Sequence, residues 1–381
     1  MHSHSRRSFL RQTLGACFTG AAVLDQAIFR AARARAQAPS ALPKLFDLEK
    51  LADGVYAAVA RPVTMLNCNA AIFENSTDIL IMDTHSKPSA VASLVRQIRD
   101  EITPKPVRYV VASHFHWDHS QGTPAYKRIA PHADIVASAA TRKLMDEHTV
   151  PRLKASFEEI QKSMASYKEK LAAAKTPEEK AYYQRVLAES RDYLAEMKAF
   201  TPELPNVTLT SDLIIHDKSH DLHLAFRGRG HTSGDVIVWC PQKRVVATGD
   251  LLHSFFPFIA DGYPLEWPRT LLKVAELDFT RVAGGHGTPH PSKDRLHQMA
   301  NYIEELAERV AVGKRNRTLQ QLQAEILPAS LRTLTDGGYG QYAAENNLKY
   351  RVFPPSASVA TVVADSVSSN IAQIFATLEK T

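Results

Sequence analysis

The sequence has little cysteine, and its N-terminal apolar run is too short to cross a membrane. The 381 residues include three cysteines, Cys17, Cys68 and Cys240. Their spacing matches neither a zinc finger nor a disulfide framework, and a chain of this length can build a core without disulfides. We expect Cys68 and Cys240 to be small buried side chains. The run from Leu14 to Leu24 is shorter than the ~20 residues of a membrane-spanning helix, so no membrane span is expected.

The sequence also has little net charge outside its first 36 residues. The whole chain carries a formal charge of +6, but residues 1–36 hold six arginines and one acid, Asp25. The remaining 40 basic and 39 acidic residues give a charge of about +1. A protein that binds nucleic acid usually keeps a basic surface. We therefore expect a small-molecule substrate and no nucleic-acid partner.

The N-terminal segment combines paired arginines with an alanine-rich end. "SRRSFLRQ" precedes the short apolar run, and "ARARAQA" follows it. The segment resembles a twin-arginine export signal, which implies that residues 1–36 are removed and that the folded protein reaches the bacterial periplasm or is secreted. We place the cleavage after Ala36 rather than Ala38, because Pro39 would follow the second site. An ordinary first helix is the alternative. "LGAC" imitates a lipobox, but too little apolar sequence precedes Cys17 for lipidation.

Short apolar runs alternate with helical stretches along residues 37–290. Helices are expected at 88–101, 120–130 and 268–277. Together with the strands, they predict an α/β fold in which helices cover sheet, followed by a helical C-terminal extension over 291–381. Strands are expected in the runs "GVYAAVA", "AAIFEN", "DILIMD", "VRYVVAS", "DIVAS", "LHLAFRG", "DVIVWC" and "RVVATGD".

Residues 145–200 predict an antiparallel helical hairpin inserted into this domain. Apolar side chains recur at alternating spacings of four and three from Leu153 to Leu171, as in a coiled-coil seam. "AKTPEEK" interrupts the seam, and Thr176, Pro177 and Glu179 have the pattern of a capping box that starts a second helix. Three roles stay open for the hairpin: a structural arm, a lid over a site, or an arm through which the protein forms a homodimer.

The stretch "HFHWDH", His114 to His119, places four polar side chains after an apolar run. Alternate side chains of an extended segment share a face, so His114 and His116 should point the same way. Asp118 and His119 follow where the chain begins to turn, and they can address a second point nearby. Imidazole and carboxylate groups are ligands that zinc, iron and manganese favour. The motif therefore predicts a metal site.

Three further candidate ligands lie in or directly after glycine-rich turns. His231 lies in "GRGHTSGD", Asp250 ends "VVATGD", and His286 lies in "VAGGHGTPH". Glycine lets the backbone approach a buried metal closely. One such residue alone would more often be structural, but three in the same context, downstream of the dense motif, are expected to complete the site.

The order H-x-H-x-D-H-x-x-G, followed by single His, Asp and His motifs, resembles the metallo-β-lactamase superfamily over about residues 45–290. The resemblance implies an αββα sandwich with a dinuclear site at one edge, filled by two divalent ions, with zinc favoured over iron or manganese. It also implies that Asp83, in "IMDT", braces the metal-binding loop, although His85 stands where a glycine is common in that family. The implied ligands are His114, His116 and His231 for the first metal, Asp118, His119 and His286 for the second, and Asp250 as the bridge.

The resemblance implies hydrolysis by hydroxide shared between the two metals, which would attack the carbonyl of a small ester, thioester, lactone or amide. Asp118 would be the catalytic residue that orients the hydroxide. Asp250 favours thioesterases and lactonases, because β-lactamases usually lack an aspartate at that position. His116 disfavours oxygen-reducing diiron members, which generally carry a carboxylate there. The alternatives are a persulfide-dioxygenase-like enzyme with one iron and a metal-stabilised binding module whose partner surface is the hairpin.

Two features beside the motifs stay open at this point. His253 could contact substrate or be a hydrogen-bonded structural residue, whereas His290 is expected to be structural. The aromatic side chains of residues 254–267 could wall an apolar pocket or pack beneath the C-terminal helices.

Overall fold

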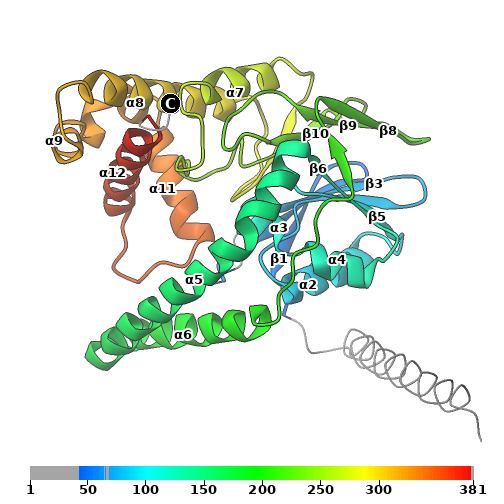
Figure 1. Ribbon diagram of the computed structural model, residues 1–381, viewed down its shortest axis with the longest axis horizontal. Coiled ribbons are helices and arrows are strands. Elements are labelled where there is room, and N and C mark those ends of the chain that lie inside the picture. The colour runs from blue at the N-terminus through cyan, green and yellow to red at the C-terminus, as the bar shows by residue number, and fades with distance from the viewer. Residues whose placement is uncertain (1–42, 64, 66–67, 379–381) are drawn as a thin grey trace, which may run out of the picture. The chain divides into compact units, whose positions relative to one another are not determined.

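Two facing β-sheets with helices on their outer sides make up the unit Lys44–Thr381 (Figure 1). The structure is a computed structural model that describes residues 43–63, 65 and 68–378, so the expected export signal lies outside it. The strands are β1 (Phe46–Ala52), β2 (Val55–Ala60), β3 (Ala70–Glu74), β4 (Ile79–Met82), β5 (Val107–Val111), β6 (Asp134–Ser138), β7 (Val207–Leu209), β8 (Asp212–His216), β9 (Asp221–Phe226), β10 (Val236–Cys240), β11 (Val245–Gly249) and β12 (Arg281–Gly284). The helices are α2 (Pro88–Glu101), α3 (Trp117–Ser120), α4 (Thr123–Ile129), α5 (Ala139–Ala173), α6 (Pro177–Met197), α7 (Trp267–Ala275), α8 (Asp294–Gly313), α9 (Leu319–Glu325), η1 (Pro328–Ser330), α10 (Arg332–Thr335), α11 (Tyr339–Tyr350) and α12 (Val359–Thr377).

The two sheets each contain a parallel part that directs loops to one edge. In the described part of the chain, the first sheet has the order β1-β2-β3-β4-β5-β6-β7 and the second the order β12-β11-β10-β9-β8. Strands β4 to β7 run parallel to one another, as do β11 and β12. Because parallel strands end at the same edge of a sheet, the loops after β4 and β5, and those after β11 and β12, start close together.

Strand β4 illustrates how alternating side chains hold the layers together. Ile79 and Ile81 pack in a cluster that includes Leu94 of α2, on the outer side of the first sheet. Leu80 and Met82 point the other way, into the cluster between the two sheets. All four strand side chains are buried, and burial of one such side chain contributes about 1.5–3 kcal/mol.

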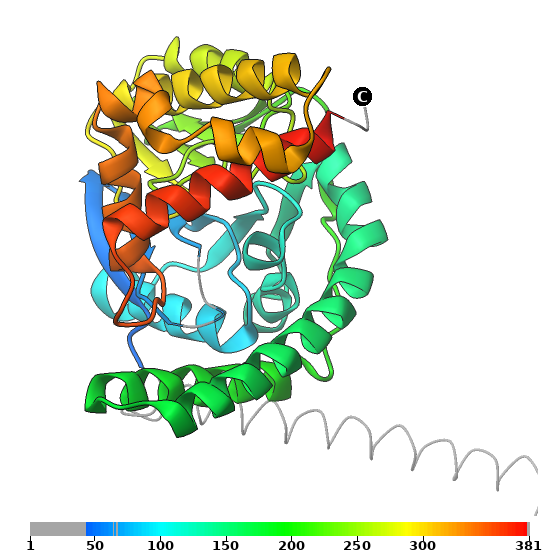
Figure 2. The same cartoon turned by 90° about the vertical axis from the view of Figure 1, so that its left-hand side faces the viewer.

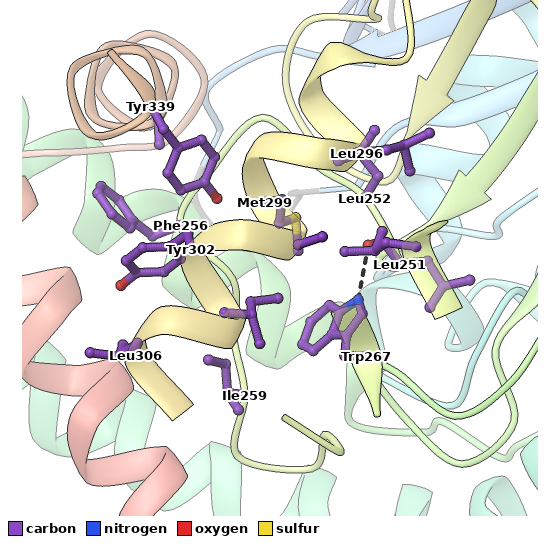
Figure 3. Close-up of a cluster of buried hydrophobic side chains, with 14 of the residues drawn as sticks. Leu251, Leu252, Phe256, Ile259, Trp267, Leu296, Met299, Tyr302, Leu306 and Tyr339 are labelled. Carbon is purple, nitrogen blue, oxygen red and sulfur yellow. Dashed lines mark hydrogen bonds between the residues drawn. The ribbon is translucent and has the colours of Figure 1, made fainter. Parts of the chain in front are cut away.

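A third cluster covers the outer side of the second sheet with the C-terminal helices (Figure 3). Trp267 of α7 and Tyr302 of α8 are fully buried in it, and the indole N–H of Trp267 donates to the backbone oxygen of Leu251 over 3.1 Å. Phe256 and Ile259 also belong to this cluster. These side chains of the stretch 254–267 therefore pack beneath the C-terminal helices.

Two helices, α5 and α6, form the predicted hairpin and lie side by side (Figure 2). The capping box of Thr176 and Glu179 is present at the start of α6. Leu153, Tyr193 and Met197 of the hairpin form a small buried cluster, and Met145, Val186 and Leu187 are also buried. The hydroxyl of Tyr193 donates to the side-chain oxygen of Gln121 over 2.9 Å, which ties the hairpin to the turn after the histidine-rich motif.

The α/β sandwich with an inserted helical hairpin and a helical C-terminal region is thus confirmed. The sequence-based expectations missed the strands β1, β7, β8 and β12, and the short helix α3. The helix expected at 120–130 is present as the shorter α4, which begins after Gly122, whose backbone packs directly against Thr84.

Helix α12 is long and apolar enough to cross a membrane by length and composition alone, and it is the one such helix in the described residues. Its buried side chains Val362, Val367, Ile371 and Ile374 join the cluster over the second sheet. Packing in a core accounts for this apolar face, and length and composition are weak evidence of a membrane span.

Candidate metal centre

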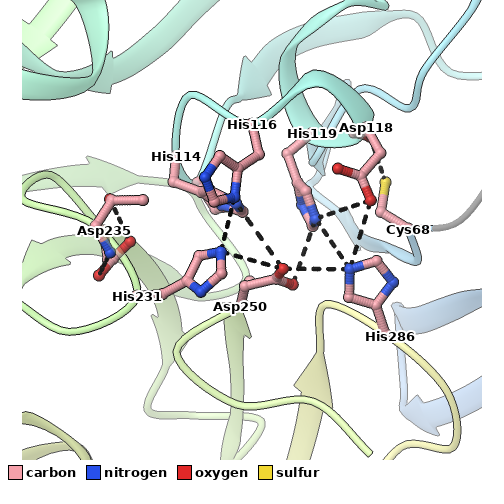
Figure 4. Close-up of polar contacts among 12 residues, drawn as sticks. Cys68, His114, His116, Asp118, His119, His231, Asp235, Asp250 and His286 are labelled. Carbon is pink, nitrogen blue, oxygen red and sulfur yellow. Dashed lines mark hydrogen bonds and ion pairs between the residues drawn. The ribbon is translucent and has the colours of Figure 1, made fainter. Parts of the chain in front are cut away.

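The loops at the shared edge of the two sheets bring all seven predicted ligands together (Figure 4). They come from the ends of β5, β9, β11 and β12 and from the short helix α3. All seven are buried, at 9% exposure or less. They form two groups, one of His114, His116, His231 and Asp250, and one of Asp118, His119 and His286.

The first group converges on one carboxylate oxygen. Nε2 of His231 lies 2.8 Å from Nδ1 of His116 and 3.4 Å from Oδ2 of Asp250. Nε2 of His114 lies 3.9 Å from the same oxygen. Three imidazole nitrogens thus face one carboxylate, and each histidine presents one particular ring nitrogen to the group.

The second group surrounds the other side of the same carboxylate. Nε2 of His119 lies 3.3 Å from Nε2 of His286 and 3.6 Å from Oδ2 of Asp118. Nε2 of His286 lies 3.5 Å from Oδ2 of Asp118. Asp250 connects the groups, because its Oδ1 lies 3.3 Å from Nε2 of His119 and its Oδ2, which faces the first group, lies 3.2 Å from Nε2 of His286.

These separations fit divalent metal ions. Two ligands that each bind zinc at about 2.0–2.2 Å in a tetrahedral arrangement lie roughly 3.3–3.6 Å apart, and the second group matches this edge length. Two atoms that point into the cluster, Nε2 of His114 and Oδ1 of Asp250, are buried without a hydrogen-bond partner in the described residues. Buried polar atoms are normally paired, so a cation is the partner that this donor set lacks.

The charges of the cluster also suit metal binding. Burial, followed by the neighbouring imidazoles, lowers the pKa of His114 and of His231 well below the ordinary value. Both rings are therefore neutral and offer lone pairs. Burial alone would raise the pKa of Asp250, but His286 and His119 outweigh it and hold that pKa well below its ordinary value. Asp250 is thus a carboxylate that faces imidazoles on two sides.

Two side chains behind the ligands set the orientation of their rings. Asp83, at the end of β4, has Oδ2 2.9 Å from Nδ1 of His119, and its Oδ1 accepts the backbone N–H of Ser113 over 2.9 Å. The hydroxyl of Ser113 lies 2.9 Å from Nδ1 of His114. These contacts occupy Nδ1 of both rings and leave Nε2 for the cluster.

Cys68 contacts both the histidine-rich motif 114–119 and the side chain of His85. The thiol of Cys68 donates to the backbone oxygen of Asp118 over 2.7 Å and lies 3.2 Å from Nδ1 of His85. His85 adopts a left-handed backbone conformation with φ 64°, which explains why glycine suits this position. Burial lowers the pKa of His85 to about 3, so this ring is neutral. Both described cysteines, Cys68 and Cys240, are buried and free.

Glycine allows the loop that carries His286 to approach Asp250. A Cβ atom at Gly285 would lie 2.0 Å from Oδ1 of Asp250 and 2.9 Å from the backbone carbon of Gly249. No side chain fits in that space, so "GGH" is required by the close approach of the two ligand loops.

The sequence did not reveal Asp261 and Arg152, which together support His116. Nε2 of His116 lies 2.9 Å from Oδ2 of Asp261. The guanidinium of Arg152, on α5, donates to both oxygens of that carboxylate, over 2.7 and 2.8 Å. Burial would raise the pKa of Asp261, but the hydrogen bonds from Arg152 and His116 outweigh it and lower that pKa. The hairpin thus contacts the metal centre through one carboxylate.

A cleft of about 330 Å³ opens over the two ligand groups. Its lining includes Trp117, His253, Phe255, Phe258 and Arg351 as well as the ligands His116, Asp118, His231, Asp250 and His286. His253 is buried, its Nδ1 has no hydrogen-bond partner in the described residues, and burial lowers its pKa to about 4. It therefore lines the cleft as a neutral ring. His290, in contrast, contacts Ser254 and Tyr342 and does not line the cleft.

Comparison with known proteins gives one family. A family model described as the metallo-beta-lactamase superfamily matches residues 64–297, which include all seven ligands. Similar solved structures include a metallo-beta-lactamase from Pontibacter korlensis, with 17% identity and a TM-score of 0.49, covering 67% of this chain and 97% of that chain. They also include the metallo-beta-lactamase FIM-1 from Pseudomonas aeruginosa in its mono-zinc form, with 17% identity, a TM-score of 0.49 and coverage of 69% and 99%. No curated protein matches the chain.

Proposed function

The chain belongs to the metallo-beta-lactamase superfamily, and from this premise we propose that it is a dinuclear zinc hydrolase that cleaves a small ester, thioester, lactone or amide. The observation that supports the proposal is the position of Asp250 between the two ligand groups, with Oδ2 near His231 and Oδ1 near His119. A carboxylate in this position can serve two ions at once, which favours a dinuclear site over a site for one iron.

The seven ligands would provide one set of donor atoms for each of two ions, with Asp250 shared between the sets. When bound, two divalent ions supply a water molecule of lowered pKa and polarise a carbonyl oxygen. His114, His116 and His231 would hold one ion, Asp118, His119 and His286 would hold the other, and Asp250 would bind both.

Side chains that line the cleft can orient the water molecule, accept its proton and exclude bulk water. The carboxylate of Asp118 lines the cleft, where it can orient a water molecule and accept its proton. Phe255 and Phe258 line the same cleft and can exclude bulk water from a bound substrate. Asp83 and Asp261 keep the rings of His119 and His116 in place while the proton moves.

A hydrolase panel tests this proposal. Purified mature protein loaded with zinc is assayed on acyl thioesters, lactones, aryl esters and β-lactams, beside His231→Ala and a matched His220→Ala variant outside the cluster. We expect hydrolysis by the wild type and by His220→Ala, and none above background by His231→Ala. Iron in the purified protein, with oxygen consumption on a persulfide and no hydrolysis, would favour the iron enzyme instead.

We also propose that residues 1–36 direct export of the folded protein to the periplasm. The paired Arg6 and Arg7, the short apolar run and the alanine-rich end support this role. Cell fractionation of a strain that expresses the full chain, beside an Arg6→Lys and Arg7→Lys double variant, tests the proposal. We expect mature protein in the periplasm for the wild type and unprocessed protein in the cytoplasm for the variant. Equal processing of both would contradict export by this route.

A further inference from the structure

Arg351 places a positive charge in the cleft from a part of the chain that carries no metal ligand. It follows directly after α11, whose last residue is Tyr350, and its own backbone is extended, with φ −116° and ψ 165°. Its side chain lines the cleft together with Asp118, Phe255 and His286. The C-terminal helical region therefore contributes a charged group to the candidate active site.

The helix that carries Arg351 is fastened to the loops that carry the ligands. The hydroxyl of Thr288, two residues after His286, lies 3.0 Å from Oδ1 of Asn346 and 3.0 Å from the hydroxyl of Tyr350. The hydroxyl of Tyr342 donates to Oγ of Ser254, four residues after Asp250, over 3.1 Å. These contacts fix the end of α11 relative to the second ligand group, so the position of Arg351 is built into the fold.

One aromatic ring separates Arg351 from a predicted metal ligand. Cζ of Arg351 lies 5.9 Å from the centre of the Phe255 ring. The Phe255 ring stacks on the ring of His286, with 5.4 Å between centres and 29° between planes. A molecule whose carbonyl lies at the ligand cluster could therefore extend along Phe255 and reach the guanidinium within a few bonds.

Arg351 differs from the other arginine of the cleft in having no counter-ion. Arg152 is paired with both oxygens of Asp261. Among the described residues, no carboxylate forms an ion pair with Arg351 and no group accepts a hydrogen bond from its guanidinium. Arg351 is solvent-exposed where it lines the cleft, and Asp118 is the acid whose charge acts on its guanidinium. Asp118 belongs to the metal cluster, so the guanidinium keeps its donors for another anion.

We propose that Arg351 binds an oxyanionic group of the substrate, so that the hydrolase acts on an ester, thioester, lactone or amide that carries a carboxylate, phosphate or sulfate a few bonds from the scissile carbonyl. This inference rests on the proposed function, since it places the carbonyl at the ligand cluster. A guanidinium offers a planar pair of donors that matches such oxyanions and binds them with charge-assisted hydrogen bonds.

Binding of paired anions tests the proposal without turnover. Glutarate and butyrate each offer one carboxylate to the metal centre, but glutarate offers a second one to Arg351. Isothermal titration of the zinc-loaded mature protein should show glutarate binding about 10- to 100-fold more tightly than butyrate, as expected for one charge-assisted hydrogen-bonded pair. Equal affinities for the two anions in the wild type would overturn the proposal.

Two variants test whether the preference for glutarate over butyrate depends on Arg351. In Arg351→Met, glutarate should bind no more tightly than butyrate. Lys349→Met removes an exposed cation two residues away, which does not line the cleft, and should keep the preference. A preference that survives in Arg351→Met contradicts the role of this residue. Arg351→Gln, which keeps a polar side chain at the end of α11, replaces Arg351→Met if the latter does not fold.

A third ligand and an ester pair complete the experiment. Replacing glutarate with 4-phosphonobutyrate distinguishes a phosphate site from a carboxylate site, because the preferred anion should bind more tightly and lose more affinity in Arg351→Met. The aryl esters 4-nitrophenyl butyrate and mono-4-nitrophenyl glutarate should differ in kcat/KM in the same direction as the anions differ in affinity. If neither ester, nor any member of the panel, is hydrolysed, the proposed hydrolase function fails, whereas the titrations still decide whether Arg351 is an anion site.

Discussion

Nε2 of His116 lies 2.9 Å from Oδ2 of Asp261, a residue 145 positions further along the chain. The other ring nitrogen of His116, Nδ1, lies 2.8 Å from Nε2 of His231 within the first ligand group. A carboxylate that accepts the Nε2 proton leaves the Nδ1 lone pair for a metal ion. Because Arg152 of α5 holds the same carboxylate, the inserted hairpin helps to position a metal ligand.

Replacing Asp261 should therefore weaken the first metal site. In Asp261→Asn the side chain no longer attracts the Nε2 proton as strongly, and we expect zinc affinity at that site to fall by about 10- to 100-fold. Competition with a chromogenic chelator measures the loss. Asp212→Asn, which removes an exposed carboxylate paired with Arg227, is the matched control. Unchanged zinc affinity in Asp261→Asn would show that His116 does not depend on this contact.

Replacing Asp83 should likewise weaken the second metal site. Its Oδ2 holds Nδ1 of His119, while its Oδ1 still accepts the Ser113 N–H after an Asp83→Asn change. We expect the loop to stay folded and zinc affinity at the second site to fall by about 10-fold or more. Titration of the metal-free variant with zinc should then show one strong and one weakened step. Two steps as strong as those of the wild type would contradict this role.

Gly122 is predicted to be indispensable for folding of the motif. A Cβ atom there would lie 1.7 Å from the backbone oxygen of Thr84 and 2.7 Å from Cγ2 of Val91. Overpacking of this kind costs about 1–3 kcal/mol or more, so Gly122→Ala should lower the free energy of unfolding by at least that amount. In the control Gly337→Ala the nearest atom lies at 3.4 Å, and urea unfolding should be almost unchanged. Equal stability of the two variants would mean that the backbone around Gly122 can move.

Removal of metal should also destabilise the whole domain. The buried carboxylates of Asp118 and Asp250 lie among five histidines, and ions bound between them stabilise the folded state by mass action. With zinc at about 100 times its dissociation constant, one site adds about 2.7 kcal/mol. We expect a chelator to lower the melting temperature by several degrees and added zinc to restore it. A melting temperature that does not respond to either would argue against metal ions in this cluster.

The sequence predicted the local features of the site well. His114, His116, Asp118 and His119 lie in one short stretch, and the glycines around His286 mark a close approach that the structure contains. Strands such as β4 were predictable because they are continuous apolar runs. Strand β8, with its alternation of exposed and half-buried residues, and β12, with four residues, gave too weak a pattern.

The contacts that join distant segments were not predictable from one sequence. Asp261 lies in a loop whose local pattern, "ADGY", is that of an ordinary turn. Arg351 lies at the end of a C-terminal helix, and no spacing connects it with the ligands. Both acquire their roles only when α5 and α11 pack beside the cleft. The homodimer through the hairpin stays a prediction, which sedimentation of the mature protein can test.

The metal content of the wild type and of Asp250→Ala tests the central claim most directly. Both proteins are purified as residues 37–381, loaded with zinc, dialysed against metal-free buffer and measured by mass spectrometry for zinc per chain, with Asp212→Ala as an exposed control. We predict close to two zinc ions for the wild type and the control, and a joint loss of metal and hydrolysis in Asp250→Ala. Two tightly held ions in Asp250→Ala, or full activity of the wild type without metal, would contradict a dinuclear centre built around this carboxylate.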